Sequence, residues 1–158
     1  MIEDGPDAFM KRWRAHAAEA VLFARPEGSP LLEAEVGPVI VQLLERTNPY
    51  GSDPGPARII INPTATLATS EDATPHVHVP ARGALEGRGT ITATWEDVVV
   101  VDAGIPLVIA IDKTGQAEER TFETGMHVAF EAAPPIHGFV VPPEARRSTE
   151  ARAVDEAQ

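Results

Sequence analysis

The sequence predicts a mainly β protein of the α+β class, in which an N-terminal amphipathic helix packs on an antiparallel β-meander that closes into a barrel or a sandwich. Three observations lead to this fold class. Apolar residues near the N-terminus recur at helical spacing, short strand-like segments separated by turn residues follow Pro56, and two of these segments are continuously apolar.

The helix is expected over about residues 7–24. Spacing of three and four residues places one set of apolar side chains on a single helical face: Phe9, Trp13, Ala17, Ala20, Val21 and Ala24. Asp4 or Asp7 can serve as N-cap, and Arg25-Pro26 ends the segment. Phe9 and Trp13 are expected either in the core or against a partner in a homodimer.

Residues 31–46 leave two interpretations open. Their first half alternates apolar and acidic residues in the manner of a strand. The run after Gly37-Pro38 is apolar enough for a second strand or for a short helix that begins at Pro38. Residues 47–56 are rich in turn residues and are expected to form a loop within one domain.

The β-rich part spans about residues 57–141. Strands are expected over 58–62, 64–69, 75–79, 90–95, 98–102, 105–112, 120–124, 126–132 and 136–141. The runs Val98–Val101 and Leu107–Ile111 are predicted to be covered on both faces, because a half-exposed strand would alternate polar and apolar residues. The N-terminal helix is expected to supply part of that cover.

Residues 1–143 are predicted to form a single domain, followed by a polar C-terminal tail over 144–158 that is either helical or disordered. The chain has no cysteine and no apolar run of the roughly 18 residues that a membrane helix requires. We therefore expect a soluble, cytoplasmic protein without disulfides or thiolate metal sites.

The net charge of the chain restricts the kinds of partner that we expect it to bind. The chain carries 24 acidic and 13 basic residues, a net charge of −11, which repels the phosphate backbone of nucleic acids. Aromatic residues make up 5% of the chain and supply few platforms for stacking bases. The expected partner is a second copy of the chain or another protein, with no nucleic acid or membrane.

The most suggestive local pattern is His76-Val77-His78. Residues two apart in a strand point to the same face, so both imidazoles are expected together, with Val77 facing the core. Paired imidazoles are a common nucleus of a divalent metal site that needs further ligands. His127 is the predicted third ligand; Glu131, on its face of the same strand, and His137 are further candidates. The alternative is two histidines on a solvent-exposed face.

The segment from His76 to Ile111 also resembles part of the cupin family. It carries three motifs in the family's order: His76-Val77-His78, Leu85-Glu86-Gly87-Arg88-Gly89, and Val98–Pro106. The chain departs from the family at two ligand positions, with Arg82 and Gly83 in place of the glutamate and Leu107 in place of the last histidine. The resemblance implies a β-barrel that lacks the conventional metal site.

Two classes of function follow. No G-x-S-x-G elbow or other complete catalytic constellation is present, so no catalytic residue and no cofactor is predicted. The favoured class is a non-enzymatic binding or structural domain that acts by association. The alternative is a cupin-like barrel that binds a metal or a small molecule through His76 and His78.

Overall fold

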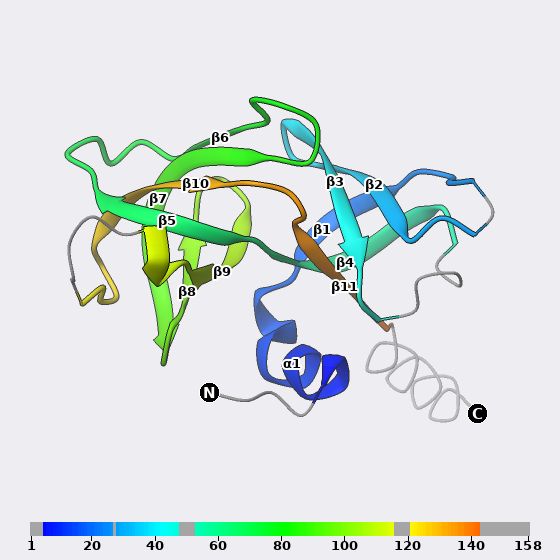
Figure 1. The fold of residues 1–158 in the computed structure, drawn as a ribbon, viewed down its shortest axis with the longest axis horizontal. Helices are drawn as coiled ribbons and strands as arrows, with labels where there is room; N and C mark the ends of the chain where they lie inside the picture. Colours follow the sequence, from blue (N-terminus) through cyan, green and yellow to red (C-terminus); the bar gives the residue numbers. More distant parts are fainter. Residues whose placement is uncertain (1–4, 27, 48–52, 116–120, 143–158) are drawn as a thin grey trace, which may run out of the picture.

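The computed structural model describes residues 5–26, 28–47, 53–115 and 121–142, which contain eleven strands and a short N-terminal helix (Figure 1). The elements are α1 (Pro6–Trp13), η1 (Arg14–His16), β1 (Ala18–Leu22), β2 (Leu31–Val36), β3 (Val39–Glu45), β4 (Gly55–Asn62), β5 (Thr64–Thr69), β6 (His76–His78), β7 (Leu85–Trp95), β8 (Val98–Asp102), β9 (Pro106–Ile111), η2 (Lys113–Gly115), β10 (His127–Ala132) and β11 (His137–Val141). The predicted fold class, mainly β with an N-terminal helix, is confirmed. The tail predicted over 144–158 lies outside the described residues.

The N-terminal helix is shorter than predicted. It ends at Trp13 and passes through the 3-10 turn into β1, so the prediction of a helix to residue 24 is wrong in its second half. In β1 burial alternates residue by residue, with Ala18, Ala20 and Leu22 inside. Ala17, Ala20 and Val21 would share one face of a helix, whereas Ala18, Ala20 and Leu22 share one face of a strand, and the pairing of β1 with β4 decides for the strand.

The open question over residues 31–46 is resolved as a β-hairpin. β2 and β3 pair in antiparallel register from Leu31↔Leu44 to Val36↔Val39 around a turn at Gly37-Pro38. Gly37 has a positive φ of 54°, which glycine adopts at low cost. The short-helix interpretation after Pro38 is therefore wrong.

Two other segments differ from expectation. β7 begins at Leu85, well before the predicted start at residue 90, because its first half is held between β6 and β10. Of the strand predicted over 120–124, the described residues 121–124 are not in a strand. Phe122 is nevertheless buried, so its apolar character reflects packing without strand pairing.

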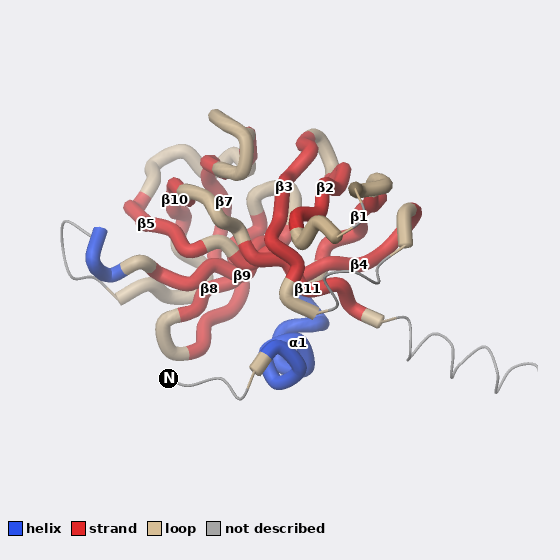
Figure 2. The backbone as a smooth tube through the Cα atoms, turned by 45° about the vertical axis from the view of Figure 1, so that its right-hand side comes forward, coloured by secondary structure: helices blue, strands red, loops and turns tan. Residues whose placement is uncertain are grey.

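The strands form two closed rings that lie side by side (Figures 1 and 2). The first barrel has the order β1-β2-β3-β11-β4, and β4 pairs back with β1. The second has the order β10-β5-β9-β8-β7, and the pairing of β10 with β7 closes it. β6 pairs with β7 along the same edge as β8, one strand after the other. Most pairings are antiparallel as predicted, but β3–β11 and β5–β9 are parallel.

The two parallel pairings mark an exchange of strands. β4 belongs to the first barrel and continues across Pro63 into β5 of the second, while β10 belongs to the second and continues into β11 of the first. The hydrogen bonds at the two crossings match. Ala110 N donates to Pro63 O at 2.9 Å, and Leu44 N donates to Ile136 O at 2.8 Å. Strands β1–β5 and strands β7–β11 therefore form two halves with the same topology. The last strand of each half, β5 or β11, belongs to the barrel of the other half.

The interiors of both barrels form one connected apolar cluster, and a second, smaller cluster lies outside the barrels at their junction. Three consecutive isoleucines show the division: Ile59 and Ile61 point into the first barrel, whereas Ile60 faces the smaller cluster beneath α1. The runs in β8 and β9 are divided in the same way, which confirms the predicted burial on both faces for Val99–Val101 and Leu107–Ile109. Val98, Ala110 and Ile111 are half-buried.

α1 covers the junction of the barrels (Figures 1 and 2). Phe9 stacks on Phe139 of the first barrel at 4.6 Å between ring centroids, and Trp13 meets Trp95 of the second edge-on at 6.4 Å. Arg12 lies 3.6 Å above the Trp95 ring, in position for a cation–π interaction. In the part of the chain that is described, no helix is long and apolar enough to cross a membrane.

Trp13→Ala is expected to lower the free energy of unfolding by about 3–5 kcal/mol, because the buried indole contacts side chains of both barrels and its removal leaves a cavity. The measurement is urea denaturation followed by circular dichroism. Lys11→Ala on the exposed side of α1 is the control, with an expected change within about 0.5 kcal/mol. Equal losses in the two variants would contradict the role assigned to Trp13.

Candidate functional site

The imidazoles of His76 and His78 lie next to each other on the outer face of β6, as their spacing predicts. Their ring centroids are 5.2 Å apart, both side chains are exposed, and Val77 between them is buried in the barrel core. The structure therefore brings two of the three predicted metal ligands together.

β6 can lie against β7 because β7 carries a glycine at the point of contact. His76 pairs with Arg88 and His78 with Glu86, so Gly87 stands opposite Val77. A Cβ at Gly87 would collide with the backbone carbonyl of His76 and meet the Phe130 ring 3.0 Å away. The glycine of the Leu85–Gly89 motif thus serves close packing of strands.

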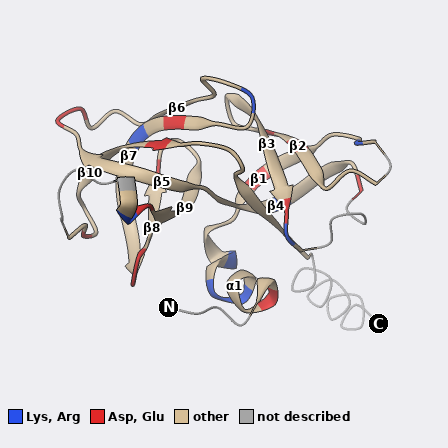
Figure 3. Ribbon diagram, in the orientation of Figure 1, with Lys and Arg blue, Asp and Glu red and all other residues tan. Residues whose placement is uncertain are grey.

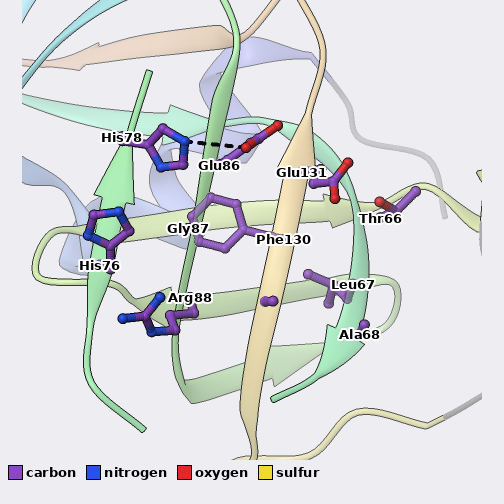
Figure 4. A pocket seen from close by; sticks show the side chains of 11 residues that line it. Thr66, Leu67, Ala68, His76, His78, Glu86, Gly87, Arg88, Phe130 and Glu131 are labelled. Carbon is purple, nitrogen blue, oxygen red and sulfur yellow. Dashed lines mark ion pairs between the residues drawn. The ribbon is translucent and has the colours of Figure 1, made fainter. Parts of the chain in front are cut away.

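A pocket of about 380 Å³ opens on this outer surface (Figure 4). Its polar walls come from His76 and His78 on one side and from Thr66 and Glu131 on the other. Its floor is made of small and apolar groups of the three strands β5, β7 and β10: Leu67, Ala68, Gly87, Ala129 and Phe130. The remaining lining residues, Glu86 and Arg88, project from β7 between the walls.

The polar groups of the pocket largely engage neighbouring residues. His78 Nε2 lies 3.3 Å from Glu86 Oε1, and Arg88 Nη2 lies 3.3 Å from Asp72 Oδ2. Hydrogen bonds from the backbone amide and the hydroxyl of Thr74 hold the pKa of Asp72 below its usual range, and Arg88 adds a smaller effect. Glu131 stands directly opposite Glu86 in the β7–β10 register, which sets two like charges side by side.

His127, the predicted third ligand, is not among the residues that line this pocket. It pairs with Thr90 in the β10–β7 register, and its Nδ1 lies 2.9 Å from Thr90 Oγ1. Across the described ranges, no group of three or more His, Asp or Glu side chains is placed to hold a metal ion. The carboxylates nearest to the histidine pair in the strand register are those of Glu86 and Glu131.

His137 lies away from the pocket, on β11 of the first barrel. Arg46 Nη1 is 3.3 Å from its Nδ1, and because arginine can only donate, this nitrogen acts as the acceptor of a neutral imidazole. Burial, with a further effect of the Arg46 charge, lowers the pKa of His137 below 6.5. His137 therefore acts in the packing of β11 against β3.

His137 makes stability depend on pH with a definite sign. Its pKa is lower in the folded chain than in the unfolded chain, so unfolding takes up a proton once the pH falls below about 6.5. The free energy of unfolding is expected to be fully retained above that pH and to decline as the pH falls through the folded-state pKa. Urea denaturation at pH 7.5, 6.5 and 5.5 measures this decline, which should be smaller in His137→Gln. An equal decline in both proteins would contradict it.

The sequence did not reveal a second candidate site, which is the outer face of the sheet β1–β2–β3. The four large hydrophobic side chains that are exposed among the described residues, Val21, Phe23, Leu31 and Ile40, all belong to this face or to the residue that extends β1. Their exposed fractions range from 37% for Phe23 to 54% for Ile40. The helical spacing of the sequence predicts Val21 on a helix, whereas its alternation with the buried Ala20 and Leu22, which reveals the face, has the period of a strand.

The cupin resemblance does not extend to the topology. Within segment 76–111, β7, β8 and β9 lie next to one another in sequence order as a meander, and β6 pairs with the first half of β7. Cupins are jelly rolls built from Greek keys, in which consecutive strands are not all neighbours. Comparison of the sequence with protein-family models and with curated proteins finds no match.

Proposed function

We propose that this chain is a non-enzymatic protein-binding domain that acts through the outer face of β1–β2–β3. The observation that carries the proposal is the gathering of Val21, Phe23, Leu31 and Ile40 on one face of the first barrel. Scattered single hydrophobic residues are normal on a protein surface, whereas a contiguous group bordered by polar residues is typical of an interaction site.

The strand register gives the arrangement of these four residues on the face. Val21 pairs with Glu35, which pairs with Ile40, so the two apolar side chains flank one carboxylate in a single row across the sheet. Phe23 continues the same edge and donates its backbone amide to Glu33 O at 2.9 Å. Full burial of one exposed large apolar side chain contributes about 1.5–3 kcal/mol, and these four are 37–54% exposed, so a partner that covers all of them gains roughly half of that figure for each. This gain offsets part of the cost of association.

The polar groups elsewhere support a binding domain without catalysis. His78, Arg88 and His127 each contact a neighbouring side chain of the same barrel, in arrangements that hold strands and loops together. The absence of cysteine from all 158 residues supports a reducing compartment such as the cytoplasm.

A photo-crosslinking amino acid at position 40 is expected to trap a discrete partner in cells, because Ile40 is the most exposed of the four apolar residues. Mass spectrometry of the adduct identifies the partner as another protein or as a second copy of the chain. The same crosslinker at the exposed Thr94 of the second barrel is the control. Identical adducts at both positions, or none at position 40, would count against the proposal.

A second candidate function is binding of a divalent metal or a small molecule in the pocket of β6 and β7. It is favoured by the two imidazoles, which lie 5.2 Å apart and face the same pocket as Glu131. Two imidazoles and a carboxylate are ligand types that suit zinc, iron and manganese.

Metal content separates this candidate from the first. If the pocket binds metal, protein equilibrated with Zn²⁺, Fe²⁺ or Mn²⁺ and then desalted should retain it stoichiometrically by elemental analysis. His76→Ala/His78→Ala should abolish retention, whereas His127→Ala should leave it unchanged, since His127 bonds to Thr90 outside the pocket. Metal-free wild-type protein after all three equilibrations would eliminate the metal site.

A further inference from the structure

We infer that the partner presents a basic amphipathic helix from another protein to the face β1–β2–β3; this inference rests on the function proposed above. The face contains three rows across the sheet. Val21, Glu35 and Ile40 form the first row, and Phe23, Glu33 and Gln42 the second. In the third row Leu31 pairs with Leu44. Two glutamates of β2 therefore occupy the centre of an otherwise apolar or neutral surface.

These central carboxylates have no basic partner within the described part of the chain: neither Glu33 nor Glu35 takes part in an ion pair or a side-chain hydrogen bond there. Basic groups at the border are engaged elsewhere. Arg25 Nη2 lies 2.7 Å from the buried Glu45, and Arg58 donates to Arg14 O at 2.8 Å.

Two further groups border the face. Arg58 also approaches the exposed Glu19, beside Val21 on β1, at 3.8 Å, so the two opposite charges offset each other and the net negative charge of the face comes from Glu33 and Glu35. The loop between β6 and β7 approaches Gln42 through Gly83, and no ion pair joins its neighbour Arg82 to Glu33 or Glu35 in the described residues. The face is therefore negative as well as apolar.

Charge decides what can cover this face. A partner that covers Val21 and Ile40 also removes water from Glu35 between them, and a carboxylate that loses water without gaining a cation is strongly penalised. A Lys or Arg side chain compensates that loss. A second copy of this chain would instead bring its own Glu33 and Glu35 against the same pair, with a net charge of −11 on each molecule.

The other half of the molecule indicates the shape of the occupant. Glu33 pairs with Gln42 in the hairpin β2–β3, and Val100 pairs with Val108 at the corresponding position of the hairpin β8–β9. Val100 and Val108 of the second barrel are therefore the counterparts of Glu33 and Gln42. Val100 and Val108 are buried with Phe9 and Trp13 of α1. In the second half this surface is covered by Ile60 of β4 and Phe139 of β11 together with α1, an amphipathic helix whose Lys and Arg positions are blue in Figure 3. The equivalent surface of the first half is the one that carries Glu33 and Gln42.

The spacing of the two glutamates also suits a helix. Residues two apart in a strand are about 6.6–7 Å apart, and basic residues four apart on a helix have Cβ atoms about 5–6 Å apart. A helix with Lys or Arg at such positions, flanked by leucine-type residues, matches the pattern of two carboxylates between apolar edges.

The inference is tested with a synthetic 18-residue amphipathic helix of Leu and Lys, titrated into the full chain by calorimetry at 50 and 300 mM salt. Glu33→Gln/Glu35→Gln is expected to weaken binding at least about tenfold and to reduce its salt dependence. Glu71→Gln/Glu123→Gln removes the same charge from exposed positions of the second barrel, and should leave the affinity within about twofold. Val21→Thr/Ile40→Thr should weaken binding while leaving the circular dichroism spectrum unchanged.

A peptide with Gln in place of every Lys separates the possible failures. If it binds as tightly as the Lys peptide and Glu33→Gln/Glu35→Gln has no effect on the affinity, the inference of a basic partner is wrong, whereas the proposed binding face is retained. If Val21→Thr/Ile40→Thr changes neither peptide's affinity, and Val21→Thr leaves crosslinking at position 40 unchanged, the proposed function itself fails. A concentration-dependent dimer in sedimentation velocity that Ile40→Thr abolishes would replace the basic helix by a second copy of the chain.

Discussion

The exchange of β5 and β11 between the barrels is the constraint on which the rest of the structure depends. Each of these strands fills the gap between a meander hairpin and the strand that closes the ring, so neither barrel can close with strands from its own half alone. The crossings are fastened by paired backbone bonds: Asp112 N donates to Ala65 O and Arg46 N donates to Gly138 O, each at 2.8 Å. The exchange explains why the interiors of the two barrels form one continuous core.

The same exchange brings outer faces of the two barrels together and creates the apolar junction that α1 covers. Ile60 of β4 and Phe139 of β11 belong to the first barrel, and Val100 and Val108 to the second, yet all four are buried in one cluster. Within it the ring of Phe9 contacts that of Phe139. α1 therefore covers the apolar junction that the exchange of strands creates. This is why a helix of eight residues can matter to the stability of both barrels.

Sequence patterns predicted the elements that depend on local chemistry and missed those that depend on distant partners. The alternation of β2, the turn at Gly37-Pro38 and the two fully buried runs are local, and the structure contains them. The strand β1 was missed because Ala18–Leu22 satisfies both periods, and only its pairing with β4 distinguishes them. The histidine pair followed from strand alternation, whereas the position of His127 depended on which residue of β7 it faces. The face β1–β2–β3 required knowledge of three strands at once.

The two halves share a topology but use the same surface differently, and this contrast is the strongest argument for a binding role. Where the second half has Val100 and Val108 buried in the cluster that contains Phe9 and Trp13, the first half has the half-buried Glu33 and Gln42, with the exposed Val21 and Ile40 in the adjacent row. A surface that faces only solvent rarely gathers four large apolar residues on one sheet, and a surface under a permanent internal cover rarely keeps carboxylates without a cation among them. Apolar side chains around accessible carboxylates suit a partner that associates and dissociates, because the same groups remain hydrated when the partner is absent.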